Sequence, residues 1–313
     1  MNDLFLGIDT SNYTTSIAIV DQYGEIIEDR RKPLVVERGK KGLRQQEALF
    51  QHIKNLPALI EDLSTDLSHI KAIGVSTRPR NVEGSYMPVF LAGENAGRIL
   101  SRSLGIPMKR FSHQEGHIGT CLLGNKSHED FLSIHLSGGT TEVVRVRVAK
   151  DNLNTELVGG SLDISMGQLI DRIGVHIGLE FPCGMELDEM SMDGRLIDRR
   201  IQSKLKDGWI NLSGYENLFK RLLDEGIYGR EDIIYTLFHH LGEIIVELIK
   251  SAKEDHHVNR VYVVGGVSAN SIIRTGLAQG KMDVEICFPH KSLSTDNGVG
   301  VAYLAACKEG WEE

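Results

Sequence analysis

Two histidines, His113 and His117, stand four residues apart in the stretch His113-Gln114-Glu115-Gly116-His117. If the stretch is helical, their side chains lie one turn apart on one face and can bind a single divalent metal ion. The alternative is two ordinary histidines of an amphipathic helix. Gln114 stands where a zinc protease of the His-Glu-x-x-His type needs its general base, so the pattern disfavours that class. Glu115 should point away from the histidine face, and a metal site therefore needs another ligand.

Asp296 is the acid best placed to supply that ligand. It lies in Ser294-Thr295-Asp296-Asn297-Gly298, which opens the last predicted helix and follows a predicted strand over 284–288. An acid at a helix start often serves only the helix dipole, and that interpretation stays open. Strand ends of an α/β domain, however, face the side where ligands bind.

Two further stretches have the residue types of nucleotide contacts. Ser137-Gly138-Gly139 joins predicted strands, and glycines there let backbone N–H groups approach phosphate oxygens, although an ordinary hairpin turn would look the same. Gly265-Gly266 precedes Asn270 between a strand and a helix, where close packing alone could demand glycine. On a predicted helix over 164–177, Asp163 could be the cap, and Asp171 lies two turns further along; either could equally serve a salt bridge.

Short strands alternate with helices along the chain, which indicates an α/β fold. The expected strands are 4–8, 14–20, 25–36, 70–75, 131–136, 141–148, 260–264 and 284–288. The expected helices are 43–63 with a kink at Pro57, 89–104, 164–177, 185–190 and 232–253, and residues 195–228 look irregular and polar. After Pro107 the pattern starts again. Residues 9–15 align with 135–141 without a gap, which predicts a duplicated fold with a cleft between its halves.

Composition limits the classes of function. A chain of 313 residues exceeds what one core usually serves, so we expect two domains. The net charge of −8 argues against a uniformly basic nucleic-acid binder. Positions 30 to 44 contain one acid, Glu37, and seven basic residues: Arg30, Arg31, Lys32, Arg38, Lys40, Lys41 and Arg44. These basic residues could bind phosphates or simply form a solvated face. Four cysteines without a C-x-x-C pair predict reduced thiols in the cytoplasm, and no membrane segment is expected.

Taken together, these motifs resemble the TsaD-type family of tRNA threonylcarbamoyladenosine (t6A) synthases, formerly labelled O-sialoglycoprotein endopeptidases. The resembling stretches are LGIDTS, HQEGH, LSGGTTEVV, GGSLDISMGQLIDRIGVHIGLEFPCG, GGVSAN and STDNGVGVAY, in family order over nearly the whole chain. The resemblance implies a duplicated actin-like ATPase fold of two α/β domains. We expect these at 1–106 with 297–313 and at 107–296, the latter carrying the metal and nucleotide site.

The resemblance also implies a set of site residues. Its metal ligands fall on His113, His117 and Asp296 and would bind one divalent ion. This ligand set suits iron or zinc. Its contacts to ATP, AMP or an acyl-adenylate fall on His135, Leu136, Ser137, Gly138, Gly139, Asp171, Gly184 and Asn270. The implied reaction moves a threonylcarbamoyl group from threonylcarbamoyl-adenylate to N6 of an adenosine in tRNA, with partner proteins, and no catalytic side chain is assigned. A homodimer or a heterodimer with a paralogue is possible.

Three departures from the family pattern indicate a divergent paralogue. Tyr13 stands where an acid is usual, Thr140 where histidine is usual, and Cys183 at a glycine of a Pro-Gly-Gly. Because Tyr13 and Thr140 would lie near the active site, an alternative function is a nucleotide-binding regulatory partner of a related subunit. Peptidase activity follows only from the old label, and the absence of a G-x-S-x-G motif disfavours it.

Overall fold

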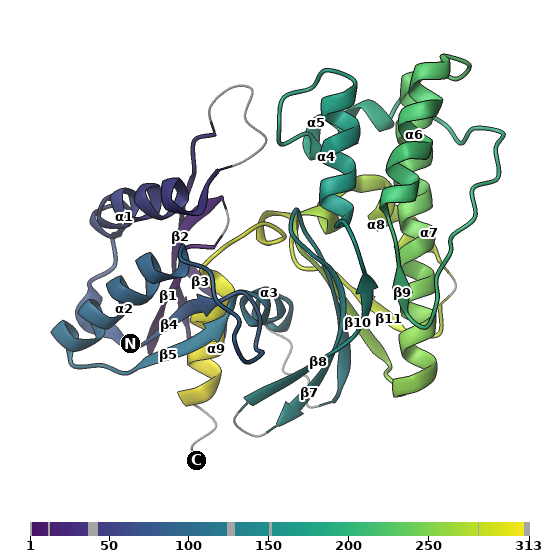
Figure 1. The fold of residues 1–313 in the computed structure, drawn as a ribbon. Coiled ribbons are helices and arrows are strands. Elements are labelled where there is room, and N and C mark those ends of the chain that lie inside the picture. The colour runs from purple at the N-terminus through teal and green to yellow at the C-terminus, as the bar shows by residue number, and fades with distance from the viewer. Residues whose placement is uncertain are drawn as a thin grey trace.

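Two mixed β-sheets, each with helices on its faces, make up the computed structural model (Figure 1), which describes residues 2–11, 13–36, 43–123, 129–149, 152–280 and 282–309. The first sheet has the strand order β3-β2-β1-β4-β5. Its strands are β1 (Leu4–Asp9), β2 (Thr14–Asp21), β3 (Ile26–Pro33), β4 (Ile70–Arg78) and β5 (Met108–Ser112). β1, β2 and β3 pair antiparallel, whereas β4 and β5 continue parallel to β1.

The second sheet repeats this arrangement and has the order β11-β10-β6-β7-β8-β9. Its strands are β6 (Phe131–Leu136), β7 (Thr141–Ala149), β8 (Asn152–Ser161), β9 (Trp209–Ile210), β10 (Arg260–Val264) and β11 (Glu285–Cys287). β6, β7 and β8 are antiparallel, and β10 and β11 run parallel to β6. Each sheet thus begins with a hairpin and a third antiparallel strand, then adds parallel strands beside the first. The predicted duplication is confirmed.

Helices α1 (Gln45–Glu61) and α2 (Phe90–Leu104) cover the outer face of the first sheet, and α3 (His113–Leu122) and α9 (Val299–Glu309) lie between the two sheets (Figure 1). Strand alternation explains this division, because Leu6 and Ile8 pack under α1 and α2 while Phe5 points to the other face. The inner cluster also takes side chains from the second sheet, including Phe131 and Tyr262. Helix α3 is therefore buried between the halves.

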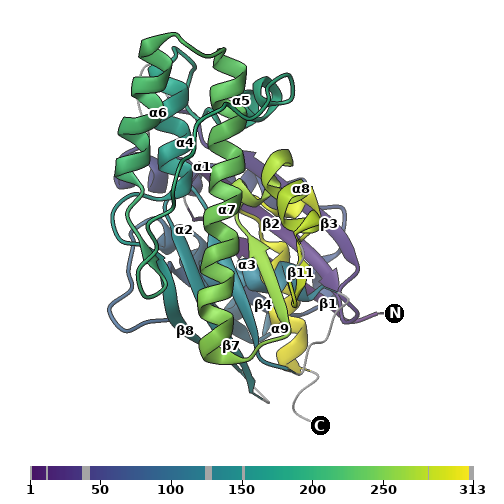
Figure 2. The ribbon, with the colours of Figure 1, turned by 90° about the vertical axis from the view of Figure 1, so that its right-hand side faces the viewer.

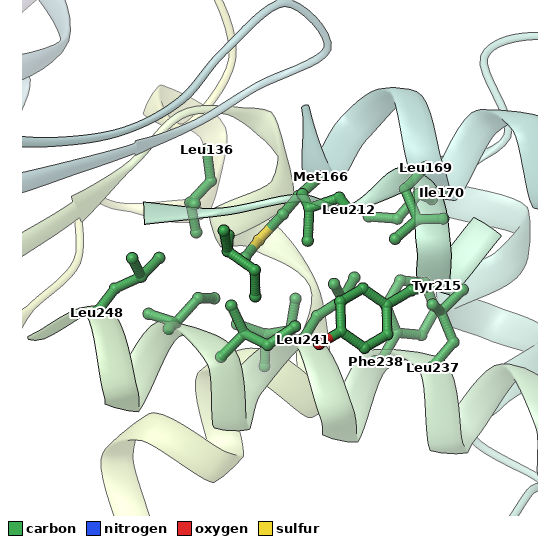
Figure 3. Packing of buried hydrophobic residues seen from close by; sticks show 14 of the residues in the cluster. Leu136, Met166, Leu169, Ile170, Leu212, Tyr215, Leu237, Phe238, Leu241 and Leu248 are labelled. Atoms are coloured by element: carbon green, nitrogen blue, oxygen red, sulfur yellow. The ribbon is translucent and has the colours of Figure 1, made fainter. Parts of the chain in front are cut away.

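The outer face of the second sheet carries the largest core. Helix α7 (Arg230–His256) runs along it (Figure 2), with the other helices of this half beside it. Those helices are α4 (Met166–His176), α5 (Gly184–Ser191), α6 (Ser213–Glu225) and α8 (Ser271–Gln279). Side chains such as Met166, Leu212 and Leu241 interdigitate there (Figure 3). Short 3₁₀ helices η1 (Leu67–His69), η2 (Gly266–Ala269) and η3 (Lys291–Leu293) complete the structure.

Several predictions of local structure were wrong. Strands β5 and β8 were missed, and the stretch 195–228 contains β9 and α6. Helix α6 was missed although its buried apolar residues, Tyr215, Phe219 and Leu222, stand at helical spacing. Helix α1 spans Pro57 as expected, and the kink expected at this proline stays a prediction. The domain boundary at residue 106 stays a prediction, but β5, which lies beyond it, pairs with β4 in the first sheet.

Candidate metal centre and its surroundings

The N-terminus of α3 is fixed by a capping box that also accounts for Glu115. The Ser112 hydroxyl accepts a hydrogen bond from the Glu115 N–H (3.1 Å), and the Glu115 carboxylate accepts bonds from the Ser112 N–H (2.6 Å) and hydroxyl (2.8 Å). Glu115 thus turns back on the helix start, as expected from its position off the histidine face. The box starts the helix at His113, which sets His117 one turn further along.

His113, His117 and Asp296 meet with their ligand atoms facing one another. The two histidine Nε2 atoms are 3.1 Å apart, and Asp296 Oδ1 lies 3.3 Å from the first and 3.5 Å from the second. Ligand atoms at about 2.0–2.1 Å from a tetrahedral metal are separated by roughly 3.3–3.5 Å. The three observed separations have the size of one face of such a tetrahedron, so these residues fit a metal ion.

Asn297 and Ser16 hold the segment that carries Asp296. The Asn297 side chain donates to the carbonyls of Leu293 (3.0 Å) and Thr295 (2.8 Å) and accepts from the Val299 N–H (3.0 Å). The Gly298 N–H donates to the Ser16 hydroxyl on β2 (2.8 Å). The acid of the centre is therefore positioned by the first sheet and by the start of α9.

Asp9, at the end of β1, belongs to the centre and was missed by sequence reasoning. Its carboxylate accepts a bond from His113 Nδ1 at 2.9 Å, and the side chain is 1% exposed. A carboxylate on the far nitrogen of a metal-binding histidine fixes the ring and makes it a better ligand. The feature of the sequence that could have identified Asp9 is its position as an acid at the end of the apolar strand in LGIDTS.

His135 joins the other histidines rather than standing apart with the turn that follows it. Its ligand nitrogen and those of His113 and His117 lie within 4.8 Å of one another. Nδ1 is hydrogen-bonded with the Thr140 hydroxyl (3.1 Å), whereas Nε2 is buried and has no hydrogen-bond partner among the described residues. An orphaned buried nitrogen beside the cluster adds a fourth candidate ligand, while its expected nucleotide contact stays a prediction.

The charges of the cluster favour a cation. Burial opposes a charged His113, yet Asp9 and Asp296 on either side raise its pKa to about 10. Burial also opposes ionisation of Asp296, but hydrogen bonds from His113 and His117 hold its pKa well below the usual range. Burial lowers the pKa of His117 and of His135. Two carboxylates thus face one imidazolium, and a divalent ion would offset the remaining negative charge.

The expected phosphate turn is compact and open to solvent. The Ser137 hydroxyl accepts from the N–H groups of Gly139 (3.2 Å) and Thr140 (3.1 Å). A Cβ on Gly138 or Gly139 would meet nothing within 4 Å, which leaves the outer side of the turn accessible. Leu136, in contrast, is buried in the sheet.

The other expected nucleotide residues are connected to this turn through α4 and α5. The Ser165 hydroxyl donates to the Gly138 carbonyl (2.9 Å) and caps α4, so the prediction that Asp163 caps this helix was wrong. Asp171 accepts from the Cys183 N–H (2.8 Å) just before Gly184 starts α5. Asn270 donates to Asp188 on α5 (2.7 Å) and caps α8. These residues form one connected framework, and their contact with a nucleotide stays a prediction.

The basic stretch at 30–44 is only partly described. Arg38, Lys40, Lys41 and Glu37 lie outside the described residues. Arg30 pairs with Glu28 (2.8 Å) and Asp62 (3.1 Å). Arg31 pairs with Asp29 (2.5 Å) and donates to the Ser292 carbonyl (2.6 Å) and the Thr295 hydroxyl (3.2 Å). Both guanidinium groups therefore stabilise the structure, and Arg31 supports the segment before Asp296.

Fold and site together define an actin-like α/β protein with a candidate histidine–aspartate metal centre. Among solved structures, HypF from T. kodakarensis superposes with a TM-score of 0.64 at 15% identity, over 99% of this chain and 48% of that chain. An activator of 2-hydroxyisocaproyl-CoA dehydratase from Clostridium difficile gives 0.54 at 16% identity, over 99% and 97%. These similarities establish the fold alone.

Sequence comparison gives the family. A profile described as TsaD, tRNA N6-adenosine threonylcarbamoyltransferase, matches residues 34–303. A protein of that name from a Sulfurihydrogenibium species is 32% identical over 95% of this chain and 88% of its own length. One from Streptococcus suis is 26% identical over 99% and 95%. The chain belongs to the TsaD family, as its motifs predicted.

The three departures from the family pattern have definite surroundings. The Tyr13 ring contacts Phe181 edge-on, with centroids 5.9 Å apart, and joins the turn after β1 to the loop before α5. Thr140 bonds with His135 and Ser137. Cys183 is buried against Gly174, where an added Cβ would lie 2.3 Å from that of Cys183. Cys183 therefore fits because its neighbour is glycine.

Among the described residues, no helix combines the length and apolar character needed to cross a membrane.

Proposed function

We propose that this protein transfers a threonylcarbamoyl group from threonylcarbamoyl-adenylate to the N6 amine of an adenosine in tRNA. The observation that carries the proposal is the triangle of His113, His117 and Asp296, whose ligand atoms are 3.1, 3.3 and 3.5 Å apart. The family match over residues 34–303 supports this reaction class. In the reaction, a C–N bond forms to N6, the C–O bond to the phosphate breaks, AMP leaves with the electron pair, and the amine loses one proton.

His113, His117 and Asp296 would hold one divalent metal, iron or zinc, with His135 as a further candidate ligand. A bound divalent metal supplies Lewis acidity that makes the carbonyl under attack more electrophilic. Asp9 keeps the proton of His113 on Nδ1, so that Nε2 faces the centre. The Ser137–Gly139 turn would receive the phosphate that leaves. The buried position of α3 would exclude water from the acyl group.

The first experiment measures metal content and ligand binding on the same purified sample. We expect about one equivalent of metal in the native protein and a loss of it in Asp296→Ala, together with metal-dependent binding of AMP or of an adenylate analogue. Asp130→Ala, which removes a surface ion pair with Arg145, is the matched control and should keep the metal. A metal-free native protein after anaerobic purification and reloading would contradict the proposal.

The second experiment supplies the acceptor. Purified protein, tRNA, threonylcarbamoyl-adenylate and candidate partner proteins should give labelled tRNA, and Asp296→Ala should not. Relatives from Methanothermobacter thermautotrophicus and Methanocaldococcus jannaschii are named probable bifunctional tRNA threonylcarbamoyladenosine biosynthesis proteins, and this chain covers 55% and 54% of their length. We therefore include partner proteins in the assay. The proposed place of action is the cytoplasm, and the proposed assembly is a homodimer or a heterodimer with a paralogue.

Tyr13 favours a second candidate, a nucleotide-binding regulatory subunit without transfer activity. Its ring, packed on Phe181, occupies a position where the family usually has an acid. The regulatory candidate requires that the protein binds AMP or ATP in calorimetry and transfers no group in the assay with tRNA. This candidate fails if metal-loaded protein binds neither nucleotide.

A further inference from the structure

Arg80 lies beside the metal centre in the loop after β4. Its backbone is fixed by hydrogen bonds, while part of its guanidinium stays open to solvent. The loop docks on the start of α3, because the Gln114 N–H donates to the Pro79 carbonyl (3.1 Å) and the Arg80 N–H donates to the Ser85 hydroxyl (3.0 Å). Gln114 directly follows His113. The backbone of Arg80 is thereby fixed next to the helix that carries two of the candidate metal ligands.

The Arg80 guanidinium is anchored by Glu142 on β7. Glu142 is the cross-strand partner of His135, so both side chains lie on the same face of the sheet. Its carboxylate pairs with Arg80 and accepts a second bond from the Gln114 side chain (3.0 Å). Glu142 is 8% exposed, whereas the Arg80 side chain is 43% exposed. A buried carboxylate thus orients an arginine whose other N–H groups reach solvent beside the centre.

The neighbouring arginine provides a contrast. Arg78 donates to Asn81 (2.7 Å) and pairs with the capping-box Glu115 (3.5 Å), and its side chain is 27% exposed. Its contacts hold the loop against α3. For the Arg80 guanidinium, Glu142 is the one side-chain partner among the described residues. A guanidinium with free donors in a fixed position is suited to a carboxylate, which it can bind through two parallel bonds.

We propose that Arg80 is a specificity-determining residue that binds the free carboxylate of the threonylcarbamoyl group while the metal centre holds the acyl carbonyl. The inference rests on the proposed function and extends it, since it says which part of the acyl group the protein recognises. Adenylates whose acyl group lacks a carboxylate at that position would be poor ligands.

The test compares two hydrolysis-resistant analogues of threonylcarbamoyl-adenosine with a sulfamide in place of the phosphate. One analogue keeps the threonine carboxylate and the other carries a neutral carboxamide there. We expect metal-loaded native protein to prefer the carboxylate roughly 10- to 100-fold, the size of effect of a charge-assisted hydrogen bond. Arg80→Gln should remove this preference with little change for the carboxamide, and Arg80→Lys should keep part of it.

Arg147→Gln, which breaks an exposed arginine–glutamate pair between β7 and β8, is the matched control and should retain the full preference. Thermal unfolding of each variant verifies that it is folded. Equal binding of both analogues by the native protein, or an unchanged preference in Arg80→Gln, would overturn the inference while leaving transfer possible. If metal-loaded native protein bound neither analogue, the proposed function and this inference would both be overturned.

Discussion

At the scale of single residues, the carboxylate of Asp9 orders the candidate centre without being one of its ligands. Replacing it with asparagine keeps the shape but removes the negative charge next to His113 Nδ1, which is 2.9 Å away. We expect Asp9→Asn to bind metal roughly 10- to 100-fold more weakly, with the secondary structure unchanged. Titration against a competing chelator measures the change. Asp130→Asn should behave like the native protein, and equal affinities of all three proteins would exclude a role for Asp9.

A second residue-scale prediction concerns His135, whose Nε2 is buried without a hydrogen-bond partner among the described residues. If this nitrogen completes the metal site, His135→Phe weakens metal binding even though it buries a similar ring. The buried His240, far from the centre on α7, is the matched control, and His240→Phe should leave metal affinity unchanged. A site made by His113, His117 and Asp296 alone would instead keep its affinity in His135→Phe.

At the scale of elements, glycine decides how closely α3 and α9 approach. A Cβ on Gly300 would lie 1.8 Å from the Gly116 carbonyl oxygen, and one on Gly119 would lie 2.4 Å from the Gly300 carbonyl oxygen. Gly300→Ala must therefore push α9 away from α3 and move Asp296 from the histidines. We expect a loss of roughly 1–3 kcal/mol of stability together with weaker metal binding.

The control for Gly300→Ala is a helical glycine with free space around it. A Cβ on Gly276 in α8 would meet nothing within 4 Å, so Gly276→Ala should be neutral or stabilise the protein by roughly 0.5–1 kcal/mol. Chemical denaturation and metal titration give both quantities. Retention of metal affinity in Gly300→Ala would show that helix spacing does not set the geometry of the centre.

Asp163 joins two elements of the second half and gives a prediction about pH. Its carboxylate accepts bonds from the N–H groups of Ile164 (2.7 Å), Leu212 (2.7 Å) and Ser213 (3.0 Å). Burial opposes its ionisation, but these bonds lower its pKa to about 2. The folded-state pKa is thus below the unfolded value, so the stabilisation is complete above about pH 4 and is lost as the pH falls toward 2.

The stability difference between native protein and Asp163→Ala measures this contribution. Because the residue is exposed, we expect only roughly 1 kcal/mol at pH 7, shrinking between pH 4 and the acid limit of folding. Urea unfolding at several pH values gives the curve. A difference that does not vary with pH would mean that the charge of Asp163 contributes nothing.

At the scale of the whole molecule, the candidate centre takes ligands from α3, from the segment before α9 and, with His135, from the second sheet. Metal binding to the folded state should therefore stabilise the whole protein, by about 2.7 kcal/mol when free metal exceeds the dissociation constant a hundredfold. Calorimetric unfolding with and without a chelator measures this. The unfolding temperature of Asp296→Ala should be the same with and without the chelator. If the chelator did not lower the unfolding temperature of the native protein, the prediction would be contradicted.

The sequence predicted most of this architecture because the signals were local. Apolar runs, turn residues and the repeated hairpin motif identified the strands that begin each sheet. Strand β5 was missed because two of its five residues are basic, Lys109 and Arg110. The contact of Asp9 with His113 spans 104 positions, and periodicity contains nothing about such a separation. The ligand triangle was expected from the spacing of the two histidines and the position of Asp296 at a helix start, and the family motifs supported it.

The close contact between α3 and α9 also limits how this chain can diverge. The carbonyl of Gly298 would lie 2.0 Å from a Cβ on Gly7, so β1 adds a further glycine to those of the two helices. Drift at these positions requires a concerted change on the facing element, whereas surface positions drift alone. Homologues that have lost the histidines should therefore keep these glycines. The glycines would then identify members of the family that no longer bind the metal.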